Sequence, residues 1–251
     1  MSFQGIIISL LFRKHKRLQL KQPSSVKAAP CPAGVGILNH KVNRMASGQC
    51  LNYAGIHSAV GSDFNAANFL TLGIIGFGDI SKALAKMLTG FDCRVIAYDI
   101  YWDEETAKRL NVTYADIPTI QKEADIISIH VPSTPQTDGM INKEFLTSMK
   151  KTAFLVNTAR GRLIVAEDLA WALNNGVIAG AGMDVFSPEP PLADNPLLTA
   201  KNTVLLPHTG ACTIESHEKA GMMAAKNVAD FFAGRAVKTI LNPAYQNHTE
   251  V

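Results

Sequence analysis

Three side chains of complementary chemistry lie in the second half of the sequence. Arg160 lies in NTARGR, Glu189 in DVFSPEPP and His208 in LLPHTGAC. A guanidinium is a planar fork that matches a carboxylate, and an imidazole can give or take a proton near neutral pH. A carboxylate beside the imidazole would favour its protonated form and fix its orientation. Together they could bind and protonate a 2-oxo acid that accepts a hydride. Taken singly, each has an ordinary alternative: a surface ion pair, one of seven histidines without a role, or a solvated loop charge.

A glycine-rich segment, GFGDIS at 76–81, follows an apolar run and precedes a helical pattern. Gly76 would permit a tight turn, and Gly78 would let the backbone approach a pyrophosphate at the start of the helix. Ser81 takes the place of the third glycine of G-x-G-x-x-G, which normally allows close helix–strand packing, and serine is only slightly larger. A lone glycine pair is a weak signal, but its place between a strand and a helix predicts a dinucleotide site.

Asp99 ends the next apolar run, RVIAY, and follows Gly76 by 23 positions. A carboxylate there can accept hydrogen bonds from a ribose 2′-hydroxyl and would repel a 2′-phosphate. The spacing therefore favours NAD over NADP as the cofactor. The alternative is an aspartate that caps a helix or lies in a loop without a ligand.

Short apolar runs recur from residue 72 onward and alternate with amphipathic helical patterns. The runs are LGIIG (72–76), RVIAY (94–98), DIISIH (125–130), AFLVN (153–157), VIAGAGMDV (177–185) and TVLLP (203–207). Such continuous apolar strands are typical of a parallel sheet covered on both faces, and helices are expected over 81–88, 165–175 and 213–233. The pattern predicts an α/β fold, a doubly wound parallel sheet of the Rossmann type. Ligands bind such sheets at the carboxyl ends of the strands, where the sequence places Gly76, Asp99, 130–132, Arg160, Asp184 and His208.

Charge is unevenly distributed along the chain. Eight Lys or Arg and no acidic residue precede Asp63, although the net charge is only +3. The cluster RKHKR (13–17) is expected to be a solvated helix end, since no aromatic platform or second basic patch supports a nucleic-acid or membrane partner. An organelle transit segment remains an alternative for this acid-free start. Four scattered cysteines without a C-x-x-C pair predict reduced thiols in a cytoplasmic protein, and the sequence has no evident metal-ligand cluster.

Several long segments together resemble the D-isomer-specific 2-hydroxyacid dehydrogenase family and, within it, the phosphoglycerate dehydrogenase branch. They include LGIIGFGDI (72–80), ADIISIHVPSTPQT (124–137), FLVNTARGRLIVAEDLAWAL (154–173), GAGMDVFSPEPP (180–191) and LLPHTGACTIES (205–216). The resemblance implies an NAD-dependent enzyme for a small 2-hydroxy or 2-oxo acid, with Arg160, Glu189 and His208 as catalytic residues. It implies cofactor contacts at Gly76, Gly78, Asp79, Ile80, Asp99, Val131, Pro132, Thr158, Ala159, Arg160, Asp184, His208, Thr209, Gly210 and Ala211.

The resemblance also implies a division of the chain. Residues 1–45 would be a remnant of the substrate lobe with a dimer-arm helix, 46–212 the NAD-binding domain, and 213–251 a C-terminal helix and tail. A complete substrate lobe has no room before the glycine loop, so an N-terminal truncation is expected, together with a homodimer through the arm helix. Ala166 departs from the family, which usually has aspartate there. A catalytically silent NAD-binding module is the main alternative to an active enzyme. A nucleic-acid-associated corepressor of the same fold would rest on RKHKR alone.

Overall fold

The computed structural model describes residues 70–91, 93–237, 239–240 and 242. The expectations for residues 1–45, among them the dimer-arm helix and the RKHKR cluster, lie outside the described residues. The chain divides into two units, Met1–Gly210 and Ala211–Val251. Each unit is considered by itself.

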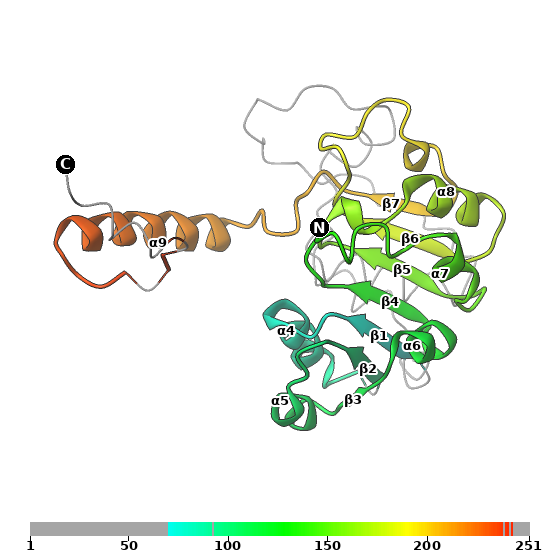
Figure 1. Cartoon of the computed structure of the whole chain (residues 1–251), viewed down its shortest axis with the longest axis horizontal. Helices are drawn as coiled ribbons and strands as arrows, with labels where there is room; N and C mark the ends of the chain where they lie inside the picture. The colour runs from blue at the N-terminus through cyan, green and yellow to red at the C-terminus, as the bar shows by residue number, and fades with distance from the viewer. Residues whose placement is uncertain (1–69, 92, 238, 241, 243–251) are drawn as a thin grey trace, which may run out of the picture. The chain divides into compact units, whose positions relative to one another are not determined.

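The first unit is built on a seven-stranded parallel sheet (Figure 1). Its strands are β1 (Thr71–Ile75), β2 (Arg94–Tyr98), β3 (Val112–Tyr114), β4 (Ile126–Ile129), β5 (Phe154–Asn157), β6 (Gly180–Met183) and β7 (Thr203–Leu205). They lie in the order β3-β2-β1-β4-β5-β6-β7. Because β1 lies between β2 and β4, the chain winds outward in both directions, and a ligand crevice is expected beyond the carboxyl ends of β1 and β4. The predicted doubly wound sheet is confirmed.

Two details of the predicted strands were wrong. β3 has no counterpart among the apolar runs, because it is a three-residue edge strand in which only Val112 is buried. The run at 177–185 is a strand only over Gly180–Met183. Its first residue, Val177, instead donates its N–H to the carbonyl oxygen of Ala172 at 2.8 Å and so belongs to the end of the preceding helix.

Helices cover both faces of this sheet. They are α4 (Asp79–Leu88), α5 (Glu104–Arg109), α6 (Ile117–Glu123), α7 (Lys143–Thr147) and α8 (Ala166–Asn174), with short 3-10 turns η2 (Gly161–Leu163) and η3 (Pro196–Leu198). Successive residues of a strand point to opposite faces, and the fully buried Ile74 and Ile75 accordingly belong to two separate apolar clusters. Leu84 of α4 packs with Ile74, whereas Ile120 of α6 and Leu169 of α8 belong to the cluster of Ile75.

The helix starts differ in a way that matters for ligand binding. Side chains of Asp103, Asp116 and Asn142 cap α5, α6 and α7 by accepting a backbone N–H at 2.9–3.0 Å. Such a cap stabilises a helix by about 1 kcal/mol. Gly78 begins α4 and has no side chain to offer. The first turn of α4 therefore keeps N–H groups that no capping side chain satisfies.

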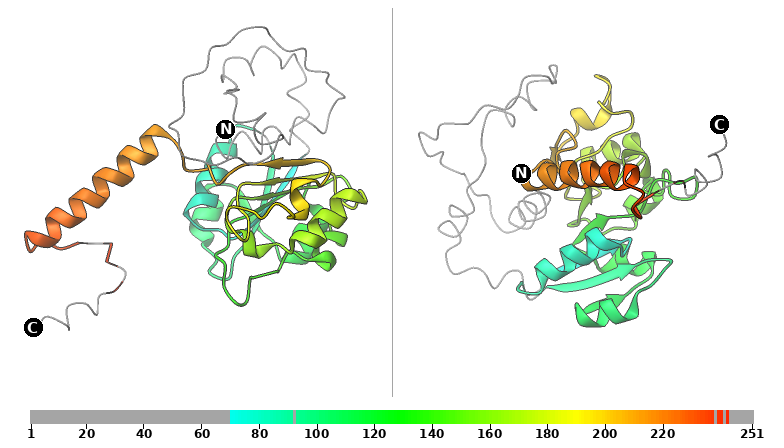
Figure 2. Two further views of the ribbon diagram at one scale, coloured as in Figure 1. Left: turned by 90° about the horizontal axis from the view of Figure 1, so that it is seen from above. Right: turned by 90° about the vertical axis from the view of Figure 1, so that its left-hand side faces the viewer.

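Within its described residues, the second unit has a long helix, α9 (Ile214–Phe232), drawn in orange in Figure 2. Thr213 caps it by accepting the N–H of Ser216 at 3.1 Å, and near its end Lys226 and Arg235 both pair with Asp230. The helix predicted over 213–233 is confirmed. In the described part of the chain, no helix has the length and apolar character needed to cross a bilayer.

Candidate cofactor and active site

The glycine loop forms a turn that a larger side chain would block at one position and not at another. Gly76 has φ +98°, and a Cβ there would lie 2.7 Å from the carbonyl carbon of His130. A Cβ on Gly78 would meet nothing within 4 Å. The Ser81 side chain is fully buried and donates to the carbonyl oxygen of Gly78 at 2.9 Å, so serine is accommodated where the motif has its third glycine. Open space beside Gly78 and the uncapped start of α4 fit a phosphate group.

Asp99 lies directly beyond β2, and its carboxylate is held in place by backbone groups. Oδ2 accepts the N–H of Phe77 at 2.6 Å, and Oδ1 accepts the N–H of Tyr101 at 2.8 Å. Phe77 is 2% exposed and stacks on Trp102 with ring centroids 5.1 Å apart. Each carboxylate oxygen has a second lone pair, so both can still accept a ribose hydroxyl. The glycine loop and Asp99 thus form one preorganised unit.

Sequence reasoning identified Asp99 but missed Phe77, Tyr101 and Trp102. Phe77 gives no local signal, because its N–H bonds to Asp99, 22 positions further along the chain, and its ring stacks on Trp102. Ile80 and Tyr101 are 68% and 84% exposed. Exposed apolar surface beside the phosphate and ribose positions is consistent with a dinucleotide, and the residues present fit NAD.

Asp184 follows β6 and anchors the loop that carries His208. It is 2% exposed, and its two carboxylate oxygens accept the N–H groups of Thr209 and Gly210, each at 2.8 Å. Its carbonyl oxygen accepts the N–H of His208 at 2.8 Å. These bonds hold His208 at φ +55°, a left-handed conformation that is uncommon for a residue other than glycine. The predicted contact of Asp184 with the cofactor stays a prediction, but its role as an anchor is directly visible.

Glu189 and His208 form the central pair of the site. Nδ1 of His208 lies 2.8 Å from Oε2 of Glu189, and Oε1 accepts the N–H of Phe186 at 2.8 Å. Partial burial raises the pKa of Glu189, but the hydrogen bonds from Phe186 and His208 and the charges of His208 and Arg160 outweigh it, so the pKa lies below its ordinary value. Glu189 is therefore an anion at neutral pH. Because Nδ1 is engaged, proton exchange with a substrate falls to Nε2.

Arg160 lies on an exposed loop just beyond β5, close enough for its charge to act on Glu189. Its guanidinium donates to the carbonyl oxygen of Ala159 at 2.6 Å. The next residue, Gly161, packs against Phe186 so closely that a Cβ would lie 2.0 Å from the Phe186 carbonyl carbon. This contact brings the Arg160 loop against the segment that holds Glu189, so the three predicted catalytic residues lie in loops at one edge of the sheet.

The remaining predicted cofactor residues lie in loops at the same edge. Val131 and Pro132 follow β4, and Thr158 and Ala159 follow β5. The N–H of Ala159 is donated to Oδ1 of Asn157 at 3.0 Å. Contacts of these residues with the cofactor stay predictions.

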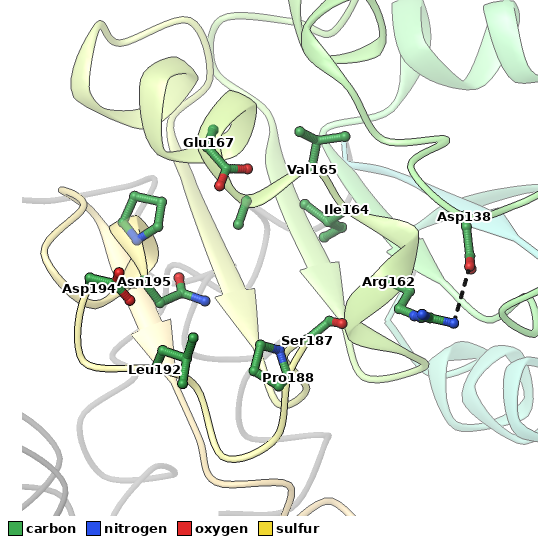
Figure 3. A pocket seen from close by; sticks show the side chains of 12 residues that line it. Asp138, Arg162, Ile164, Val165, Glu167, Ser187, Pro188, Leu192, Asp194 and Asn195 are labelled. Atoms are coloured by element: carbon green, nitrogen blue, oxygen red, sulfur yellow. Dashed lines mark ion pairs between the residues drawn. The ribbon is translucent and has the colours of Figure 1, made fainter.

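A separate cavity of about 540 Å³ lies beside the site (Figure 3). It is lined by residues of the α8 start and of the 187–196 loop, and none of the predicted catalytic or cofactor residues lines it. Arg162 and Asp138 at its margin lie 3.8 Å apart as an exposed ion pair. The candidate site is therefore the strand-end loops themselves and is distinct from this cavity.

Comparison with known proteins identifies relatives of this domain. Residues 52–210 match the family described as D-isomer specific 2-hydroxyacid dehydrogenase, NAD binding domain. The chain is 42% identical over 174 residues to a glyoxylate reductase of Thermofilum pendens, covering 68% of this chain and 51% of that enzyme. It is 41% identical over 173 residues to a D-3-phosphoglycerate dehydrogenase of Methanocaldococcus jannaschii, covering 68% of this chain and 33% of that enzyme.

A solved structure shows the same relationship. The NAD-complexed D-isomer specific 2-hydroxyacid dehydrogenase of Lactobacillus delbrueckii ssp. bulgaricus is 34% identical with a TM-score of 0.65, and the match covers 72% of this chain and 58% of that one. The chain thus spans about half, or less, of the length of the two enzymes compared by sequence. It belongs to the D-isomer-specific 2-hydroxyacid dehydrogenase family and carries that family's NAD-binding domain.

Proposed function

We propose that this protein interconverts a small 2-oxo acid and the corresponding D-2-hydroxy acid with NAD(H). The observation that carries the proposal is the 2.8 Å pair of His208 and Glu189, which lies within reach of the Arg160 charge at the sheet edge that forms the NAD site. When bound, NADH supplies the hydride. The protein's own residues must then bind the carboxylate and supply the proton.

Each residue of the set has a distinct role in this proposal. Arg160 binds the substrate carboxylate through its planar fork. His208, protonated, gives its proton to the oxygen of the carbonyl group as the hydride arrives, and in the reverse direction the neutral imidazole takes the proton from the hydroxyl group. Glu189 holds the imidazole ring in a fixed orientation through its contact with Nδ1, and reduction uses the protonated ring whereas oxidation uses the neutral one. The optimum for reduction should therefore lie at a lower pH than the optimum for oxidation.

The substrate is proposed at the level that the relatives share. One similar enzyme is a glyoxylate reductase and another a D-3-phosphoglycerate dehydrogenase, at 42% and 41% identity. A phosphorylated substrate would need a second cation. Arg162, two residues beyond Arg160, is paired with Asp138. The first substrates to test are therefore glyoxylate and hydroxypyruvate. Reduction of 3-phosphohydroxypyruvate would test for a specificity like that of phosphoglycerate dehydrogenase. The homodimer and the cytoplasmic location expected from the sequence stay predictions.

The test is steady-state reduction by the full chain, with NADH binding measured separately by titration. His208→Ala should lower turnover by at least about 100-fold and leave NADH binding intact, because a general acid is worth that much. Arg160→Ala should also raise KM, because it removes the partner of the carboxylate. The exposed His217 and Arg109 provide matched controls, His217→Ala and Arg109→Ala, which should behave as wild type.

Two outcomes would contradict the proposal. Variants of His208 and Arg160 as active as the wild type would remove their catalytic roles. A wild type that binds NADH and reduces none of the three acids would instead favour an NAD-binding module without turnover.

A further inference from the structure

We propose that Asn157 is a positioning residue that holds the loop carrying Arg160 in its substrate-binding geometry. The inference rests on the proposed role of Arg160. Asn157 is the last residue of β5, and its side chain is completely buried. Its Nδ2 donates to the carbonyl oxygen of Arg160 at 2.8 Å, and its Oδ1 accepts the N–H of Ala159 at 3.0 Å.

The loop needs these two bonds because it has no regular structure of its own. Residues 158–160 lie between β5 and η2, outside any helix or strand. Apart from the Asn157 bond, the Arg160 carbonyl oxygen accepts a long 3.4 Å bond from the N–H of Leu163. Without the Asn157 side chain, the Ala159 N–H and the Arg160 carbonyl oxygen would each lose their bond to it, and this loop conformation would be less favoured. An amide side chain offers a donor and an acceptor on separate atoms, so Asn157 can bond both backbone groups at once.

Asn157 also joins the Arg160 loop to the anchor of His208. The backbone carbonyl oxygen of Asn157 accepts the N–H of Asp184 at 3.0 Å, and the Asp184 carboxylate in turn holds the His208 loop. On the other side of the loop, Gly161 lies against the backbone of Phe186, which hydrogen-bonds Glu189. The Arg160 backbone is thus held between two fixed supports, and both supports connect to the Glu189–His208 pair.

The expected effect of removing the side chain passes through Arg160. Asn157→Ala should lower kcat/KM by about tenfold, mainly by raising KM, because the guanidinium then samples geometries that do not match the carboxylate. In an Arg160→Ala background the same change should alter kcat/KM by less than about twofold. An equal loss in both backgrounds would overturn the proposal, because it would indicate a general structural role.

A control variant separates the positioning of Arg160 from the general effect of removing an asparagine side chain that bonds the backbone. Asn142 likewise accepts a backbone N–H with its side chain, from Phe145 at 3.0 Å, at the start of α7. Asn142→Ala should lower stability and leave KM unchanged. Asn157→Asp keeps an acceptor for the Ala159 N–H but cannot donate to Arg160, so it should raise KM while it still protects that amide.

Amide hydrogen exchange gives a readout that does not depend on turnover. In Asn157→Ala, the Ala159 amide should exchange at least about tenfold faster while the amides of the central strands keep their protection. In Asn157→Asp, its protection should persist. If the wild type shows no turnover, the proposed function fails, and the exchange result alone then tests whether Asn157 holds the Arg160 loop. An unchanged exchange rate at the Ala159 amide in Asn157→Ala would overturn the proposal that Asn157 holds this loop, whatever the activity of the variant.

Discussion

Replacing His130 by glutamine should remove part of the loss of stability that the protein undergoes between pH 7 and pH 5. His130 lies directly beyond β4, with its Nε2 2.9 Å from the Ser128 hydroxyl, and burial lowers its pKa from 6.5 to about 4. In the unfolded chain the imidazole regains its ordinary pKa of about 6.5. Between these two values the unfolded chain therefore binds a proton that the native protein does not bind.

The sign and size of the effect follow from this difference in proton binding. Stability rises with pH wherever the unfolded state binds more protons, so the contribution of neutral His130 is complete above pH 6.5 and is lost as the pH falls toward 4. With the pKa lowered from 6.5 to about 4, linkage predicts a loss of about 2 kcal/mol by pH 5 and close to zero at pH 7. Glutamine keeps a hydrogen-bonding group and does not titrate.

The assay is urea unfolding of wild type and His130→Gln at pH 7 and pH 5. Any cost of the substitution itself enters at both pH values, so the difference in unfolding free energy between the two proteins should change by about 2 kcal/mol in favour of the variant at pH 5. His217→Gln, at an exposed position, serves as the control and should show no such change. Parallel stability curves for wild type and His130→Gln would refute the reasoning, because they would show that the native protein protonates His130 as readily as the unfolded chain does.

The other predictions concern the glycines and Asp99. Gly161→Ala should destabilise the protein by about 3 kcal/mol in thermal or urea unfolding, because its Cβ would lie 2.0 Å from the Phe186 backbone; near-wild-type stability would contradict the close approach. A Cβ on Gly78 would meet open space, and the residue has an ordinary φ of −89°, so Gly78→Ala should keep its stability while its affinity for NADH falls. An unchanged affinity by calorimetry would show that the phosphate does not bind beside Gly78. The wild type should bind NADH at least about tenfold more tightly than NADPH, and Asp99→Asn should narrow that ratio, because the charge is removed while an acceptor is kept. An unaltered ratio would mean that Asp99 does not face the 2′ position.

Much of the fold could be predicted because its signals are local. β1 and β4 are short, largely apolar runs of the kind that a sheet covered on both faces buries, and the structure pairs them at its centre. The start of α4 could be predicted from the strand–glycine–helix pattern. β3 could not, since a three-residue edge strand with one buried side chain has too little apolar surface to form a pattern.

Residue types and their spacing by themselves determined the parallel strands, the glycine turn, and which chemical groups stand at the strand ends. The tertiary structure alone decided which of those groups meet. Glu189 and His208 lie 19 positions apart, and their bond exists because Asp184 and Phe186 hold the two loops at one edge. In the sequence Asn157 is an ordinary strand residue, and only the folded loop shows that its side chain bonds the backbone of Ala159 and Arg160. The physical reason is that apolar periodicity encodes which face of an element is buried, whereas the partner of a donor or acceptor is set by the packing of loops from different strands.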